Sequence, residues 1–143
     1  MFSKRCIYAM KIMIYLALQG GVGVKYTGVS QVSEALSSPR AYTAKVLQQL
    51  SRAKLLKSIK GPNGGFYLEP GRTVSMADIV MAMDGDSLFT DCILGFEACT
   101  DERPCPAHFR LKHLREYLKQ ELETTHIEEM KEIIRDGRGQ IKY

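Results

Sequence analysis

Three cysteines and one histidine lie close together in the second half of the chain. They follow the pattern Cys92-x6-Cys99-x5-Cys105-x2-His108, so four metal-binding side chains fall within 17 residues. Thiolates are preferred ligands of iron-sulfur clusters, and a neutral imidazole in place of a fourth thiolate reduces the negative charge at such a centre. Zinc accepts the same ligands, although structural zinc more often uses close Cys-x2-Cys pairs. The pattern favours an iron-sulfur cluster, with zinc or a set of reactive thiols as the alternatives.

The fourth cysteine, Cys6, falls in an apolar stretch that is predicted to be helical, so we expect it in the core rather than at the centre. The sequence shows neither a secretory signal nor an apolar run of about 18 residues, the length that could span a membrane. We therefore expect a cytoplasmic protein without membrane association. In such a reducing compartment, clustered cysteines bind metal or perform redox chemistry more often than they form disulfides.

The elements around the cysteines can be predicted from periodicity. Residues 87–106 lack a hydrophobic repeat and contain prolines, which predicts a loop, and Pro106 is expected to start a long amphipathic helix. A capping box at Thr125 and Glu128 predicts one more helix after it. These helices carry more apolar surface than one small domain can cover. We therefore expect them to form a homodimer interface, with a helix folded back on its own subunit as the alternative.

Charge is distributed unevenly along the chain. Residues 1–72 contain 11 lysines and arginines against two glutamates, a formal charge of +9, whereas residues 73–143 contain nine against 14 acidic residues, a charge of −5. A basic module of this size concentrates polyanions and releases counterions from a phosphate backbone. The first half therefore favours nucleic-acid binding over an anionic membrane or a merely solvated basic face.

The basic half is predicted to begin with three helices, over 4–19, 29–36 and 39–54. The first would bury a stripe formed by Ile7, Met10, Ile14 and Leu18, and Ser38 with Pro39 is expected to start the third. Tyr42, Val46, Leu47, Leu50 and Ala53 form the predicted inward face of the third helix. Its outward face would then offer polar side chains to a DNA groove, as in a helix-turn-helix; these candidates are Arg40, Thr43, Lys45, Gln48 and Gln49.

A hairpin is predicted to follow, with strands over 55–59 and 66–68 around the run KGPNGG. The Asn63-Gly64 pair and the other glycines of this run are expected to allow the positive backbone angles of a tight hairpin. Lys57 and Lys60 would let the hairpin act as a wing that contacts phosphates, the alternative being a hairpin that only stabilises the fold. Ser75 and Asp78 form a capping box for a further helix that ends at Gly85.

Together these motifs resemble the Rrf-two family of winged helix-turn-helix transcriptional regulators. The resemblance rests on SKRCIYAMKIMIYLA, the helix pair, KSIKGPNGGFYLEP and C-x6-C-x5-C-P-x-H, and it covers residues 2 to about 136. It implies a homodimer on palindromic double-stranded promoter DNA. It also implies an iron-sulfur cluster, 2Fe-2S or 4Fe-4S, held by Cys92, Cys99 and Cys105, while His108 matches a histidine ligand found in part of the family.

The sequence thus predicts a mainly α fold with a small β-hairpin wing and a long C-terminal dimerisation helix. Residues 1–72 would form the DNA-binding domain, and residues 73–143 the iron-sulfur loop and the dimerisation helices. The function expected is a repressor that senses iron-sulfur, redox or nitric oxide status, with 2Fe-2S preferred over 4Fe-4S. A cluster-free or zinc-bound thiol-sensing regulator is the main alternative and an electron carrier a lesser one, and no catalytic motif suggests an enzyme.

Overall fold

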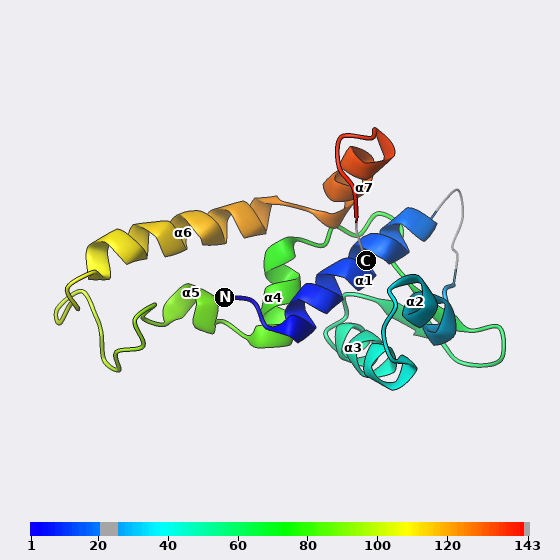
Figure 1. Ribbon diagram of the computed structural model, residues 1–143, viewed down its shortest axis with the longest axis horizontal. Helices are drawn as coiled ribbons and strands as arrows, with labels where there is room; N and C mark the ends of the chain where they lie inside the picture. The colour runs from blue at the N-terminus through cyan, green and yellow to red at the C-terminus, as the bar shows by residue number, and fades with distance from the viewer. Residues whose placement is uncertain (21–25, 142–143) are drawn as a thin grey trace.

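The computed structural model describes residues 1–20 and 26–141. It confirms a mainly helical fold with one small antiparallel sheet, and no described helix is long and apolar enough to cross a membrane. Helix α6 extends away from the body formed by α1 to α4 and carries the loop 91–107 at its far end (Figure 1). The elements are α1 Lys4–Gln19, α2 Val29–Ala35, α3 Arg40–Arg52, β1 Lys57–Ile59, β2 Gly65–Tyr67, α4 Met76–Asp84, α5 Ser87–Thr90, α6 His108–Thr124 and α7 Ile127–Arg135.

Helix α1 forms the centre of the core and packs against α3, α4 and α7. Cys6 is fully buried there, which confirms its predicted place in the core. The predicted stripe was largely wrong, because Ile7 is 44% exposed and Ile14 and Leu18 are only half-buried. Helices cover α1 on more than one side, so the buried face is wider than one stripe and rotated from the prediction; it consists of Cys6, Tyr8, Ala9, Met10, Ile12, Met13, Leu16 and Ala17.

The turn between α2 and α3 differs from the prediction by one residue. Ser37 adopts a positive φ of 48°, and Pro39 rather than Ser38 is the N-cap of α3, without a side-chain cap. The backbone N–H of Ser38 donates instead to the carbonyl of Ser33 (2.9 Å), which holds the turn closed. The predicted capping role of Ser38 is therefore wrong, because the helix begins one residue later and the N-cap position falls on Pro39, which has no side-chain acceptor.

The wing pairs Lys57 with Tyr67 and Ile59 with Gly65 in antiparallel register. The positive φ in its loop lies at Gly61 (113°), one of the glycines that were expected to allow such an angle, and not in the Asn63-Gly64 pair. Gly64 is required for a different reason, because a Cβ there would lie 2.0 Å from the Ile59 carbonyl oxygen. The glycines of the wing loop therefore serve two purposes: Gly61 adopts a positive φ, and Gly64 lets two backbone segments approach closely.

The wing is joined to the helical body through Thr27. Its backbone forms a two-way bridge with Phe66, with N···O distances of 3.0 and 2.9 Å. A Cβ on the neighbouring Gly65 would lie 2.6 Å from the Thr27 carbonyl oxygen. The position of the wing relative to α2 therefore depends on the absence of a side chain at Gly65.

In the second half, the capping box of Ser75 and Asp78 starts α4 as predicted, and Gly85 ends it with φ 75°. Residues 87–106 are not wholly irregular, since α5 lies within them. Helix α6 starts at His108 rather than at Pro106. The predicted capping box at Thr125 and Glu128 is wrong: His126 is the N-cap of α7 and its side chain forms no cap hydrogen bond.

The end of α6 is instead held by backbone pairing with the segment before α4. The N–H of Met76 donates to the Thr125 carbonyl, and the N–H of Ile127 donates to the Val74 carbonyl, both at 2.9 Å. Val74 and Ile127 are buried beside this bridge. The bridge fixes the direction in which α6 leaves the body.

Replacing Gly65 with alanine is expected to lower the free energy of unfolding by about 1–3 kcal/mol, because the added methyl group must displace the Thr27 backbone. The matched control is Gly20→Ala, since a Cβ at Gly20 would make only ordinary contacts with the Ala17 and Leu16 carbonyls. Urea denaturation of both variants measures the difference. Equal stability of the two variants would contradict the close approach between the wing and Thr27.

Candidate nucleic-acid interface and cysteine centre

Three of the five candidates on α3 are exposed on the surface of the basic half. Arg40, Lys45 and Gln48 project into solvent, and the wing residues Lys57 and Lys60 are exposed as well. Helix α3 packs against α2 in the arrangement of a helix-turn-helix, and the wing follows it directly in the chain. These five side chains form the candidate nucleic-acid interface. Two cationic side chains and one amide come from α3, the recognition helix of this motif, and two further cationic side chains come from the wing.

The other two candidates are used within the subunit. Thr43 is completely buried, and its hydroxyl donates to the Pro39 carbonyl (3.0 Å) and lies 2.8 Å from the Tyr8 hydroxyl. Gln49 is half-buried and donates its amide N–H to the Ala82 carbonyl (3.0 Å). Neither side chain is available to a groove in this structure, so their expected outward placement was wrong. They position the recognition helix instead.

Tyr42 was expected to face inward but is 36% exposed and stacks on Tyr8, with ring centroids 5.2 Å apart. Arg52, at the end of α3, is exposed as well and was not among the predicted DNA contacts. The observed inward face of α3 consists of four buried residues at spacings of three, one and three: Thr43, Val46, Leu47 and Leu50. Treating Thr43 as polar surface shifted the predicted face by about one residue.

The cysteine centre is formed by three cysteines of the loop between α5 and α6. Cys92 lies just after α5, Cys105 just before α6, and Cys99 midway between them. The three sulfur atoms all lie within 4.8 Å of one another, and the Sγ atoms of Cys92 and Cys105 are 3.8 Å apart. The structure therefore brings together three thiols that are separated by as many as 13 positions in the chain.

His108, the first residue of α6, faces this group of sulfurs. Its Nδ1 lies 3.1 Å from the Cys99 Sγ, and its Nε2 lies 2.7 Å from an Asp101 carboxylate oxygen. The same carboxylate accepts hydrogen bonds from Lys112 Nζ at 2.9 and 2.7 Å. The hydrogen bonds from Lys112 and His108 lower the pKa of Asp101 below its usual range. The histidine is 9% exposed, so its ring is held between the thiols and the acid.

The Cys92 and Cys99 thiols do not ionise equally. Hydrogen bonds from the backbone N–H groups of Phe96 and Leu94 outweigh partial burial and lower the pKa of Cys92. The backbone N–H of Cys105 lowers the pKa of Cys99, but desolvation and the neighbouring sulfurs outweigh it and leave that pKa raised. Burial raises the pKa of Cys6 to about 12, which keeps this thiol protonated in the core. Cys92 is therefore favoured over Cys99 as a thiolate.

Arg115 places a positive charge beside the cysteines. It lines a small cavity bounded by the three loop cysteines and His108, and it donates to the Asp91 carbonyl at 2.7 Å. Within the described residues, its Nε atom is buried without a hydrogen-bond partner. Three sulfur donors, one imidazole and an unused cationic N–H fit the ligand chemistry and the negative charge of a metal-thiolate cluster.

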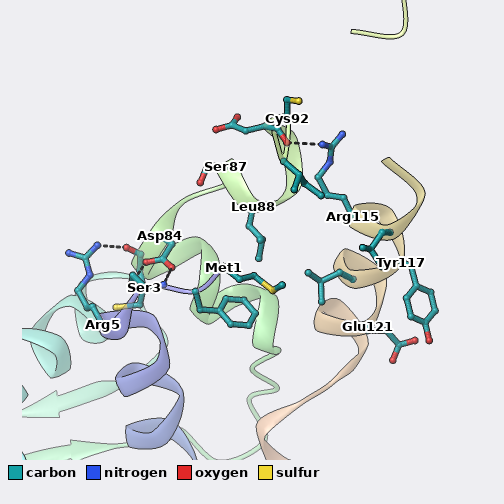
Figure 2. A pocket seen from close by; sticks show the side chains of 16 residues that line it. Met1, Ser3, Arg5, Asp84, Ser87, Leu88, Cys92, Arg115, Tyr117 and Glu121 are labelled. Atoms are coloured by element: carbon teal, nitrogen blue, oxygen red, sulfur yellow. Dashed lines mark hydrogen bonds between the residues drawn. The ribbon is translucent and has the colours of Figure 1, made fainter. Parts of the chain in front are cut away.

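A groove of about 1110 Å³ runs from the cysteine loop toward the N-terminus (Figure 2). Leu88 and Met1 point into it from one side, and Tyr117 of α6 lies on the other. Beneath it, Ser3 donates hydrogen bonds to Asp84, and Arg5 donates to the Met83 carbonyl, which joins the N-terminus to the end of α4. The groove therefore lies between the cysteine centre and the start of the basic half.

A helix-turn-helix followed by a basic wing defines a winged-helix DNA-binding regulator. The sequence profile of the Rrf2 (Rrf-two) family, described as an iron-dependent transcriptional regulator, matches residues 2–133. The chain belongs to the Rrf2 family of transcriptional regulators, which confirms the resemblance. Members of the family are transcriptional regulators and not enzymes, as the sequence predicted. Regulators of this family bind DNA and are dimeric.

Individual relatives agree with this assignment. An HTH-type transcriptional regulator of Aquifex aeolicus (strain VF5) is 29% identical over 133 residues, which is 90% of each chain. CymR, the global cysteine regulator of B. subtilis, is 27% identical with a TM-score of 0.72, over 92% of this chain and 96% of that one. The IscR of T. potens is 17% identical with a TM-score of 0.74, over 100% and 94% respectively, and supports the fold.

Replacing Lys60 with alanine is expected to weaken DNA binding and to reduce the dependence of log Kd on log salt concentration by about one, because one phosphate contact is lost. Fluorescence anisotropy with a labelled duplex over a range of salt concentrations measures both effects. Lys119→Ala removes an equal charge from α6 and serves as the control. An unchanged slope in the Lys60 variant would show that the wing does not contact the DNA backbone.

Proposed function

We propose that this regulator is a cytoplasmic repressor that senses iron-sulfur, redox or nitric oxide status through an iron-sulfur cluster. Cys92, Cys99, Cys105 and His108 would hold the cluster, and 2Fe-2S is preferred over 4Fe-4S because a mixed thiolate and imidazole set is established for 2Fe-2S centres. It would act as a homodimer on palindromic promoter DNA. The proposed DNA contacts are Arg40, Lys45, Gln48, Lys57 and Lys60; Thr43 and Gln49 would support the recognition helix from behind.

The observation that carries this proposal is the meeting of three sulfurs within 4.8 Å at the start of α6, beside His108 Nδ1. Cysteine side chains in an exposed loop have no packing reason to converge, since Ile93, Leu94 and Phe96 of the same loop are all more than 50% exposed. Contacts at the cysteine centre therefore determine the conformation of the loop more than hydrophobic burial does. This favours a bound inorganic group over a purely structural role.

A bound cluster supplies a centre that exchanges electrons and is lost on oxidation. Cys92 ties the end of α5 to the centre, whereas Cys105 and His108 tie the start of α6 to it. Helix α4 joins α5 to the body and packs against α3, so the spacing of α5 and α6 can be transmitted to the recognition helix. Release of the loop would thus change the separation of the two recognition helices in a dimer.

The surface of α6 supports a homodimer. Leu114 is 59% exposed and Tyr117 62% exposed, although both are large side chains on an otherwise amphipathic helix. They line the groove that ends at the N-terminus of the same chain. Pairing of two α6 helices across a twofold axis would cover these side chains and would set two recognition helices for the halves of a palindrome.

A second candidate is a cluster-free thiol sensor. The Sγ atoms of Cys92 and Cys105 are only 3.8 Å apart, so a two-electron oxidant could join them as a disulfide after a small movement. A similar structure belongs to CymR, the global cysteine regulator of B. subtilis. The two candidates differ in colour and in metal content, which makes them separable in one preparation.

Protein purified without oxygen is expected to absorb in the visible range because of sulfur-to-iron charge transfer, and this absorption should be lost in a Cys99→Ala variant. Cys6→Ala is the matched control and should keep the colour, with circular dichroism used to verify folding. Iron and acid-labile sulfide are measured in the same samples. A colourless wild-type protein that contains stoichiometric zinc, or that contains no metal at all, would reject the cluster.

A further inference from the structure

The acid beside His108 has no role in the set of four ligands proposed above. Asp101 lies in the loop between Cys99 and Cys105, and its side chain is 55% exposed, yet it contacts the least exposed member of the centre, His108. Lys112 binds the same carboxylate from one helical turn further along α6. Because residues four apart share a helix face, α6 presents the imidazole and the ammonium group together to one acid.

The direction of the hydrogen bonds determines which nitrogen of His108 remains free. A carboxylate only accepts, so Nε2 must carry the proton and donate to Asp101 at 2.7 Å. In the neutral ring, Nδ1 then keeps its lone pair, and this is the atom that lies 3.1 Å from the Cys99 sulfur. The ring is 9% exposed and packs edge-on against Phe109, which restricts its rotation.

We infer that Asp101 is a positioning residue of the cysteine centre, which holds His108 in the tautomer that offers Nδ1 to a metal. The inference rests on the iron-sulfur function proposed above and adds a residue outside the four ligands. A carboxylate behind a metal-binding imidazole fixes the ring orientation and makes the ligand more basic. Lys112 in turn holds Asp101 in place through hydrogen bonds to its carboxylate. The residues that support the ligands therefore extend one turn along α6.

A purely structural role for Asp101 makes a different prediction. The ion pair with Lys112 is solvent-exposed, and such pairs contribute little to stability. A loop acid near the start of a helix also interacts favourably with the helix dipole, again only weakly at an exposed position. Either effect would be similar for any nearby acid, whereas positioning of His108 requires the particular contact that Asp101 makes.

Metal-free protein titrated with Co²⁺ under nitrogen, in competition with a chromophoric chelator, tests this inference. Asp101→Ala should weaken Co²⁺ binding by about 10–100-fold. Asp101→Asn should be intermediate, because its amide oxygen still accepts from Nε2 but carries no charge. Glu102→Ala is the matched control: Glu102 is the adjacent acid of the same loop, and its hydrogen bond is to Thr100. It should change the affinity by less than threefold.

A double-mutant cycle shows whether Asp101 acts through His108. In a His108→Ala background, Asp101→Ala should have no further effect on Co²⁺ affinity. In the iron-sulfur form, the reduction potential of Asp101→Ala should become more positive than that of Glu102→Ala, because a less basic imidazole stabilises the oxidised centre less. Additive effects of the two substitutions, or equal effects of Asp101→Ala and Glu102→Ala, would overturn the inference.

The failure of this inference can be distinguished from that of the proposed function. If the wild type binds Co²⁺ and forms a cluster while Asp101→Ala behaves like the control, only the positioning role is overturned. If the wild type neither binds Co²⁺ nor forms a cluster with ferrous iron and sulfide, both are overturned.

Discussion

The structure depends on the backbone bridge that joins the turn after α6 to the segment before α4. Two hydrogen bonds of 2.9 Å, between Ile127 and Val74 and between Met76 and Thr125, hold this junction, and Val74 and Ile127 are buried at it. Helix α6 has 17 residues and therefore spans about 25 Å. Anchored at one end, it carries at the other the loop 91–107 (Figure 1), which contains the three cysteines. The length of α6 thus separates the centre from the junction, and the bridge fixes the direction of the helix that carries it.

The recognition helix is positioned by contacts that DNA does not use. Thr43 bonds to α1 through Tyr8, and Gln49 bonds to the backbone of α4 at Ala82. Helix α4 also packs against α6. A continuous set of packed helices therefore links α3 to the element that carries His108. In the proposed mechanism, a shift at the tip of α6 would reach the DNA-binding surface through these packed helices.

Sequence reasoning predicted the fold class, the fully buried Cys6 and the capping box of α4, because each depends on local pattern. It failed where tertiary contacts override such patterns. Thr43 is polar, yet it is buried because Tyr8 and the Pro39 carbonyl satisfy its hydroxyl. The predicted cap at Thr125 was wrong because the backbone of that residue is paired with Met76. The convergence of the cysteines was expected from spacing alone, whereas Asp101 could not be singled out, since four acids lie in that region.

The proposed regulation is control of DNA binding by the state of the cysteine centre, transmitted through α6. Its most direct test is to add ferrous iron and sulfide stepwise to the metal-free protein, in the presence of a labelled duplex from the DNA upstream of its own coding region. Visible absorption and duplex anisotropy are followed in the same cuvette without oxygen. The anisotropy is expected to change in proportion to the absorption and to stop changing at the same stoichiometry. Anisotropy that stays constant while the absorption rises to its full value would contradict the proposed regulation.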